Sequence, residues 1–184
     1  MSLENAMGAE VLRFWFEEAM PKQWWSNDAA FDRSIEKRFA QTLGQAVRGE
    51  VFDWRRTPKG RLAEVIVIDQ FSRNVHRNTP LAFAHDATAL VLAQEAVAAG
   101  ANEALTPVEC SFLYMPFMHS ESRAIHVQAE ALFRGNGVQS NVDFELRHKA
   151  IVDRFGRYPH RNTILGREST PEEIEFLKQP GSSF

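Results

Sequence analysis

Residues 57–68 read Thr-Pro-Lys-Gly-Arg-Leu-Ala-Glu-Val-Ile-Val-Ile, and they decide whether this chain contains a β-sheet. The Val-Ile-Val-Ile run at the end suits a buried strand as well as a helix. The Thr57-Pro58 start favours a helix, because a Thr hydroxyl can cap a free backbone amide and Pro loses no bond at the first helical position. Leu62, Val65 and Ile66 also recur at helical spacing. We therefore predict a helix that begins at Pro58.

The same Thr-Pro pair recurs at residues 79–80, 106–107 and 170–171, and it predicts three more helix starts. Glu109 and Glu173 each stand three residues after their Thr, which is the spacing of a capping box. Apolar residues at helical spacing mark the other helices. The predicted helices cover approximately residues 11–19, 31–47, 58–68, 80–98, 107–115, 119–133, 141–155 and 171–177. The pattern predicts an all-α, single-domain helical bundle of about eight helices.

The predicted domain covers residues 9–184, and residues 1–8 are set aside as a flexible or non-native N-terminus, because Met7 could also start the protein. The formal net charge of −3 argues against a nucleic-acid binder. No apolar run approaches the roughly 20 residues that span a bilayer. Cys110 is the single cysteine, so we expect no disulfide and a reducing location, the cytoplasm.

Two segments of the chain match each other at an offset of 84 residues. Residues 69–79 read Asp-Gln-Phe-Ser-Arg-Asn-Val-His-Arg-Asn-Thr, and residues 153–163 read Asp-Arg-Phe-Gly-Arg-Tyr-Pro-His-Arg-Asn-Thr, with seven of eleven positions identical. Each segment follows an apolar helix, so each is predicted to be a helix end that runs into a polar loop. The repeat indicates either duplicated architecture or duplicated chemistry.

Both segments begin with an Asp near a predicted helix C-terminus, where a negative charge opposes the helix dipole. We expect Asp69 and Asp153 to be compensated by Arg73 and Arg157, four residues later, or by an Arg of the other segment. The first segment holds two Arg against one Asp, and residues 153–167 hold four Arg against one Asp. This positive charge in an acidic chain favours an anionic ligand.

Two hypotheses follow from these loops. In the first, both loops converge on one site, where Arg forks hold a carboxylate or phosphate, Asn adds neutral hydrogen bonds and a His transfers a proton near neutral pH. In the second, the same side chains satisfy helix-end carbonyls and pair with the two Asp, so that the network is purely structural. The sequence supports the binding-site hypothesis and the structural hypothesis about equally, since buried ion-pair networks use the same residue types as binding sites.

Four motifs carry a family resemblance. They are Asp-Gln-Phe-Ser-Arg-Asn at 69–74, Tyr-Met-Pro-Phe-Met-His-Ser-Glu at 114–121, Arg-Phe-Gly-Arg-Tyr-Pro-His-Arg-Asn at 154–162 and Leu-Gly-Arg-Glu-Ser-Thr-Pro-Glu-Glu at 165–173. They resemble the bacterial family called domain of unknown function 924, over nearly the whole chain. The resemblance implies an all-helical fold of the tetratricopeptide-like class and no particular activity. It also favours a site role for His119 and Glu121.

The candidate site combines proton-transfer groups with ligand-binding groups. The proton-transfer candidates are His160, His119 and Glu121, and the ligand-binding candidates are Asp69, Arg73, Asn74, Arg77, Arg157, Arg161, Asn162 and Arg167. We expect a small anionic ligand, no cofactor and no metal, because no His pair has the spacing of a helical zinc site. Whether the protein is an enzyme, and its oligomeric state, stay open. The alternatives are a peptide-interaction module, by analogy with tetratricopeptide-like folds, and a scaffold.

Overall fold

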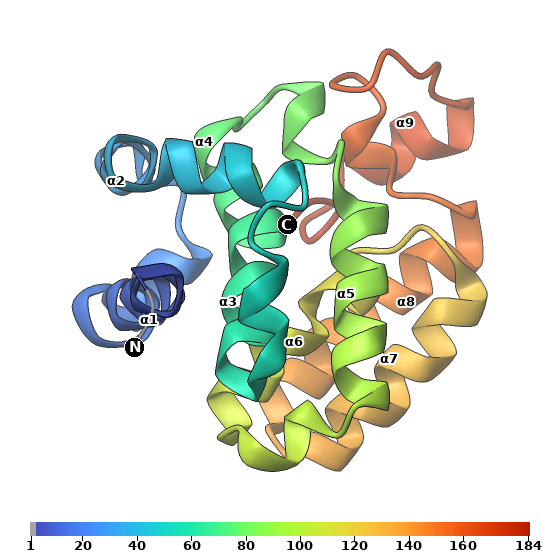
Figure 1. The fold of residues 1–184 in the computed structure, drawn as a ribbon. Helices are drawn as coiled ribbons and strands as arrows, with labels where there is room; N and C mark the ends of the chain where they lie inside the picture. Colours follow the sequence, from blue (N-terminus) through green and yellow to red (C-terminus); the bar gives the residue numbers. More distant parts are fainter. Residues whose placement is uncertain (1–2) are drawn as a thin grey trace.

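The computed structural model describes residues 3–184, with side chains from residue 6 onward, and within that range it contains helices and turns but no β-strand. The all-α prediction is therefore confirmed. Of the predicted N-terminal segment 1–8, residues 1–2 lie outside the described range, and residues 3–8 belong to the first helix. The α-helices are α1 (Leu3–Arg13), α2 (Ala29–Val47), α3 (Pro58–Ile66), α4 (Ser72–Val75), α5 (Asp86–Ala98), α6 (Pro107–Met118), α7 (Arg123–Asn136), α8 (Gln139–Phe155) and α9 (Pro171–Leu177) (Figure 1).

Short helical segments extend or connect these elements. Two are π-helical and continue an α-helix: η1 (Phe14–Glu18) follows α1, and η4 (Val67–Phe71) joins α3 to α4. Those of the 3-10 type used below are η3 (Phe52–Arg56), η5 (Pro80–Ala82) and η7 (Pro159–Arg161).

The stretch that begins at Thr57 is helical, as its start predicts. The Thr57 hydroxyl accepts a hydrogen bond from the amide of Gly60 at 3.0 Å. From Pro58 the chain stays helical to Val75, through α3, η4 and α4. Residues 62–72 are all buried, which explains why they form an apolar run instead of an amphipathic stripe. This central helix packs against α1, α5 and α6.

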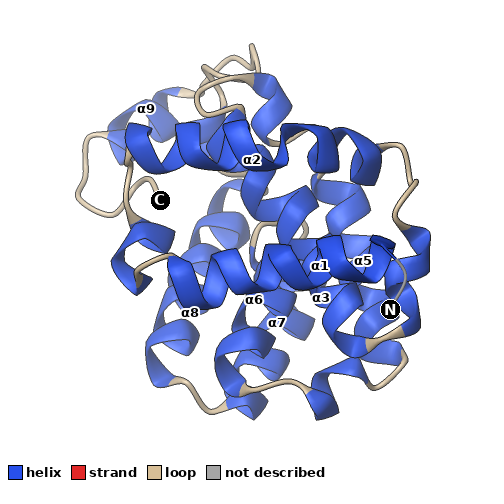
Figure 2. Cartoon of the chain, turned by 60° about the vertical axis from the view of Figure 1, so that its left-hand side comes forward, coloured by secondary structure: helices blue, strands red, loops and turns tan. Residues whose placement is uncertain are grey.

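Helices α3, α5, α6, α7 and α8 lie side by side, and α1 and α2 lie across them (Figures 1 and 2). From α5 to α8, each helix packs on the next, while α2 covers η4 and α4. A continuous hydrophobic core lies between these layers and includes many aromatic rings. The rings of Phe39 and Phe71 approach to 5.0 Å between centroids, and those of Trp15 and Phe112 to 5.5 Å. These contacts hold the N-terminal helices against the central ones.

The predicted break near Pro116 is wrong. Helix α6 runs through Pro116 to Met118, and α7 begins at Arg123 instead of near His119. Residues 109–118 are buried on all sides, and this packing outweighs the cost of an interior proline, about 3 kcal/mol. As a result His119 lies at the C-terminal end of α6, next to the central helix.

The Thr-Pro pair at 79–80 also starts no long helix, contrary to the prediction. It opens only the three-residue turn η5, and the Thr79 hydroxyl donates to the carbonyl of His76 at 2.8 Å instead of capping a helix. Helix α5 begins later, at Asp86, whose negative charge favours a helix N-terminus. The capping boxes at the starts of α6 and α9 form as predicted.

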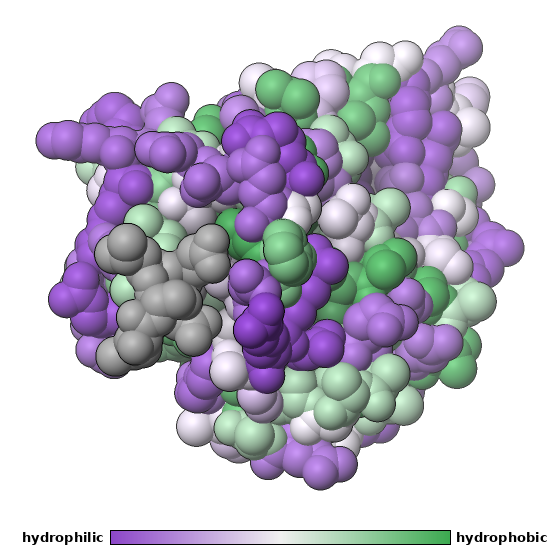
Figure 3. Space-filling model, in the orientation of Figure 1, coloured by the Kyte–Doolittle hydropathy of each residue, from purple (hydrophilic) through white to green (hydrophobic). Residues whose placement is uncertain are grey.

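The surface is mixed in character. Hydrophilic residues cover much of the face drawn in Figure 3, and apolar residues form smaller areas between them. None of the helices in residues 3–184 combines the length and the apolar composition that crossing a bilayer requires.

Candidate functional site

Asp69 lies on the π-helical turn η4, and not at a helix end as predicted, because the buried central helix continues to Val75. Turns of this kind are frequent at functional sites. Asp69 is 1% exposed, and its carboxylate accepts hydrogen bonds from Gln70 at 2.6 Å and Arg73 at 3.0 Å. The predicted pairing of Asp69 with Arg73 is therefore confirmed.

The second copy of the repeated segment has a different structure. Asp153 lies in the last turn of α8, as predicted, but it is exposed and pairs with Lys149 at 2.7 Å instead of with an arginine. Arg157 binds Glu173 with two nitrogens, at 2.7 and 2.8 Å. The repeat is therefore not duplicated architecture, because identical residues meet different neighbours in the two halves.

The two segments nevertheless meet, at Asp86 on the first turn of α5. Arg73 of the first segment reaches this carboxylate at 2.9 and 3.0 Å, and Arg161 of the second reaches it at 3.2 Å. Sequence reasoning missed Asp86, since no local motif marks it. One feature of the sequence could have pointed to Asp86 as a partner for these arginines. It is the single acid between Asp69 and Glu95, directly after the positively charged first segment.

His119 stands beside this ion network. Its Nδ1 lies 2.8 Å from the Asp69 carboxylate, and its side chain is 15% exposed. Burial and the positive charge of Arg73 lower the pKa of His119 below its ordinary value, although Asp69 opposes them. Burial alone would raise the pKa of Asp69, but Arg73 and His119 hold it below its ordinary value. At neutral pH the pair therefore consists of a carboxylate and a neutral imidazole that donates its Nδ1 proton, which leaves Nε2 as an acceptor.

A hollow of about 370 Å³ opens beside these groups, and we call it the Arg161 hollow. Segment η5 and helix α5 form one side of it. The turn after α6 and the loop after α8 form the other. Its lining combines apolar Phe83, Leu90 and Leu165 with polar Asp86, His119, Glu121 and Arg161.

Arg161 is held firmly at the wall of this hollow. Its guanidinium lies over the rings of Phe83 and Tyr158, at 4.7 and 4.6 Å from the two centroids, and it donates to the His119 carbonyl at 3.0 Å. The side chain is 7% exposed, and its buried Nε has no hydrogen-bond partner in the described part of the chain. Such a donor costs about 1–3 kcal/mol of stability while it stays unpaired.

The turn that carries His119 and Glu121 is anchored from behind. Glu121 accepts two hydrogen bonds from Arg167, at 2.6 and 2.9 Å, and one from the Tyr158 amide at 2.7 Å. Burial alone would raise the pKa of Glu121, but Arg167 lowers it, so this carboxylate carries no proton to donate at neutral pH. His126, which is fully buried, donates from Nε2 to the Ser120 carbonyl at 2.9 Å. Through its bonds to Arg167 and Tyr158, Glu121 holds this turn against the loop after α8, and His126 holds it from α7.

Two candidates of the first segment point elsewhere. Asn74 and Arg77 both bind Asp32 on α2, at 2.8 and 2.6 Å. Neither lines the Arg161 hollow. These contacts tie α4 to α2, so they support the structural hypothesis for this half of the first loop.

Three candidates of the second segment also lie outside the hollow lining. Arg157 and Asn162 contact Glu173, which caps α9. His160 packs at 5.6 Å from the Tyr158 ring, and its buried Nδ1 has no partner among residues 3–184. The second loop is therefore divided, with Arg161 at the hollow and its neighbours in the packing around α9.

The surplus of positive charge in the two loops is cancelled in three dimensions. Acids from outside the repeated segments, Asp32, Asp86, Glu121 and Glu173, pair with their arginines. Around the hollow, the three cations Arg73, Arg161 and Arg167 meet the three acids Asp69, Asp86 and Glu121, so the formal charges sum to zero when His119 is neutral.

Buried His148 and partly buried His160 predict that acid destabilises the protein. Burial lowers the pKa of His148 to about 3, and burial together with Arg161 lowers that of His160 to about 4. Unfolded histidines bind protons near pH 6.5, so between about pH 6.5 and 4 the unfolded state holds more protons and stability falls as pH falls. We expect a loss of about 2–3 kcal/mol between pH 6.5 and 5, measured by urea unfolding. A His148→Phe variant should lose about half of this dependence, and an unchanged pH slope would refute the assignment.

Comparisons with known proteins agree with this fold. A family model described as bacterial protein of unknown function (DUF924) matches residues 11–181. The solved structure of a protein of unknown function, ATU0120 from Agrobacterium tumefaciens, is 38% identical with a TM-score of 0.90, and the match covers 94% of this chain and 97% of that chain. Among curated proteins the search found no similar sequence. The chain therefore belongs to the DUF924 family of bacterial proteins.

Proposed function

We propose that the protein binds a small carboxylate-bearing metabolite in the Arg161 hollow. The observation that carries this proposal is the guanidinium of Arg161, which lines a ligand-sized hollow and is held in place over two aromatic rings. Arginine forks match carboxylates, and donors with fixed geometry lose little entropy on binding.

Charge favours a singly charged carboxylate over a phosphate. The ions around the hollow already balance, and the carboxylates of Asp86 and Glu121 line it, so each added negative charge meets repulsion. A carboxylate adds one charge, whereas a phosphate adds up to two. Phe83, Leu90 and Leu165 offer apolar surface to the rest of the ligand. We therefore favour a monocarboxylate with an apolar body.

His119 equips the hollow for proton transfer. Its neutral imidazole is oriented by Asp69, and its Nε2 can accept a proton from a bound ligand. Asp69 would then stabilise the imidazolium that forms, as a carboxylate does behind a catalytic histidine. The proposal thus extends to an enzyme that removes a proton from its substrate, with His119 as the general base.

The test compares Arg161→Lys with Arg154→Lys by thermal unfolding. Arg154 lies seven residues earlier, in the last turn of α8, but it is exposed and pairs with Glu172, so it serves as the matched control. The probes are butyrate, 3-phenylpropionate and inorganic phosphate. A ligand at ten times its Kd adds about 1.4 kcal/mol of stability, which raises the Tm of a domain this size by about 3–6 °C.

We expect a carboxylate to raise the Tm of the wild type and of Arg154→Lys, while Arg161→Lys loses most of the response relative to its own ligand-free Tm. Phosphate should act more weakly than the carboxylates. If no carboxylate shifts the wild type, or if both variants respond equally, the proposal fails and the network is a scaffold. The cytoplasm stays our proposed location, since Cys110 is a buried free thiol.

Peptide binding is supported less well. A hollow of about 370 Å³ suits a small molecule, and most of the candidate arginines are engaged with internal acids instead of lining an extended groove.

A further inference from the structure

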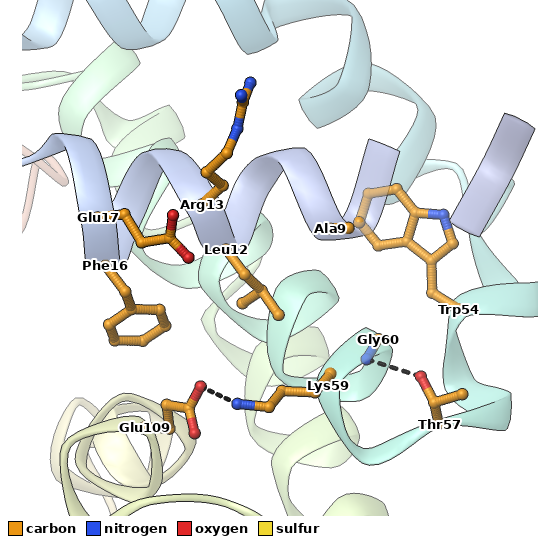
Figure 4. A pocket seen from close by; sticks show the side chains of 11 residues that line it. Ala9, Leu12, Arg13, Phe16, Glu17, Trp54, Thr57, Lys59, Gly60 and Glu109 are labelled. Carbon is orange, nitrogen blue, oxygen red and sulfur yellow. Dashed lines mark hydrogen bonds and ion pairs between the residues drawn. The ribbon is translucent and has the colours of Figure 1, made fainter. Parts of the chain in front are cut away.

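A second hollow, of about 430 Å³, lies where the end of α1 passes over η3 and the starts of α3 and α6 (Figure 4). We call it the Trp54 hollow. It shares no lining residue with the Arg161 hollow, so it is a separate feature of the molecule. Its volume falls within the range of small-molecule sites, about 300–1,000 Å³.

The walls of the Trp54 hollow are mainly apolar. Figure 4 shows Leu12 between Phe16 and the ring of Trp54, so that side chains of α1, η1 and η3 form one apolar surface. Leu12 and Phe16 are partly exposed, and Trp54 is 3% exposed. Aromatic and aliphatic surface of this kind holds a flat or branched apolar group.

Two glycines keep these walls in place. A Cβ on Gly60 would lie 2.0 Å from the Trp54 carbonyl oxygen, and a Cβ on Gly8 would lie 3.3 Å from the Trp54 ring. The close approach of these backbones fixes the indole between α1 and α3. A site that is formed before binding loses little conformational entropy when a ligand arrives.

The cations at the hollow are engaged. Lys59 pairs with Glu109, whose other oxygen accepts hydrogen bonds from the amide and hydroxyl of Thr106. Burial alone would raise the pKa of Glu109, but Lys59 and Thr106 lower it, so this carboxylate stays ionised at neutral pH. Arg13 lies 3.5 Å from Glu18 and extends away from the apolar wall (Figure 4). Neither cation is therefore free to bind an anionic ligand in this hollow.

One acid at the hollow is different. Glu17 is exposed and forms no ion pair with the side chains described from residue 6 onward, and Figure 4 shows its carboxylate on the side of Leu12 and Phe16. Arg13, Lys59 and Glu109 each have an ion-pair partner, so Glu17 is the one charged lining residue without a partner among the described side chains. We propose that the Trp54 hollow binds a small organic cation, whose ammonium group meets Glu17 and whose apolar body lies on Leu12, Phe16 and Trp54.

The experiment uses 2-phenylethylammonium as the probe and the full-length, ¹⁵N-labelled protein. Amide shifts of Gly60 report on the Trp54 hollow, and those of Arg161 report on the other hollow. The comparison ligands are 2-phenylethanol, which has the same ring without the charge, and 3-phenylpropionate, which reverses it. We expect saturable shifts at Gly60 with the amine, and about three- to fivefold weaker binding of the alcohol, the factor that one partly exposed ion pair supplies.

Two variants make the test specific. Glu17→Gln should abolish the preference for the amine over the alcohol, whereas Glu36→Gln, an exposed acid on α2, should retain it. Ala9→Phe should fill the hollow and remove the shifts at Gly60, with the fold checked by circular dichroism. Equal binding of amine and alcohol to the wild type, or an unchanged preference in Glu17→Gln, would overturn the proposal, as would shifts confined to Arg161.

Discussion

Replacing Gly60 by Ala is expected to destabilise the protein by about 3 kcal/mol, although the same change in most helices is stabilising. Gly60 lies in the first turn of α3, where its own helix would favour Ala. A Cβ there, however, would lie 2.0 Å from the carbonyl oxygen of Trp54. That oxygen is backbone and cannot rotate away, so α3 must move off η3. The Tm should fall by about 6–12 °C, measured by circular dichroism.

Gly135 provides the matched control for this prediction. It lies within α7, its φ is not positive, and an added Cβ would have no heavy atom of a neighbouring element within 4 Å. Gly135→Ala should therefore stabilise the protein by about 0.5–1 kcal/mol, as an open helical site does. Changes of the same sign and size in both variants would show that the contact between α3 and η3 does not constrain Gly60.

Asp69→Ala is expected to destabilise the protein by about 3–5 kcal/mol. Asp69 is 1% exposed and binds Gln70, Arg73 and His119, so its removal leaves Arg73 with Asp86 as its remaining carboxylate and leaves two further donors, both largely shielded from water, with fewer acceptors. Losing one member of a buried ion pair costs more than the pair contributed, because the remaining charge stays out of water. Urea unfolding at pH 7.5 measures the difference.

Asp153 is the control that the repeated segment itself supplies. The two aspartates occupy the same position in the motif, but Asp153 is 44% exposed and pairs only with Lys149, one turn earlier on α8. Asp153→Ala should change stability by no more than about 0.5 kcal/mol. Similar losses in the two variants would mean that the ion network around Asp69 is not buried as the structure has it.

Much of the helical structure follows from signals within a few residues of one another. The caps at Thr57, Thr106 and Thr170 join groups three residues apart, so the chain needs no distant partner to form them. The two predicted helix ends that are wrong, near Pro116 and at Asp69, depend instead on contacts between distant parts of the chain. Burial of the whole stretch carries α6 through Pro116 and carries the central helix past Asp69, and no local pattern reports how deeply a segment is buried.

The candidate site could be predicted only in part. Arg73, Arg161, Asp69 and His119 do come together, as convergence of the two loops required. Asn74 and Arg77 bind Asp32 instead, and this acid lies 42 and 45 residues away in the sequence. Nothing in the repeated motif distinguishes an arginine that lines a hollow from one that joins two helices.

The all-helical character, three of the Thr-Pro helix starts and the residue types of the two matching segments can all be read from the sequence. Which charges are neutralised, and which of them face a hollow, depends on how the helices pack in the folded chain. Arg161 meets Asp86 across 75 positions, and Glu17 forms no ion pair with the side chains that the structure describes. The reason is physical: a cap depends on atoms that the backbone already holds together, whereas the free energy of a charge depends on its burial and on partners that only the folded chain brings near.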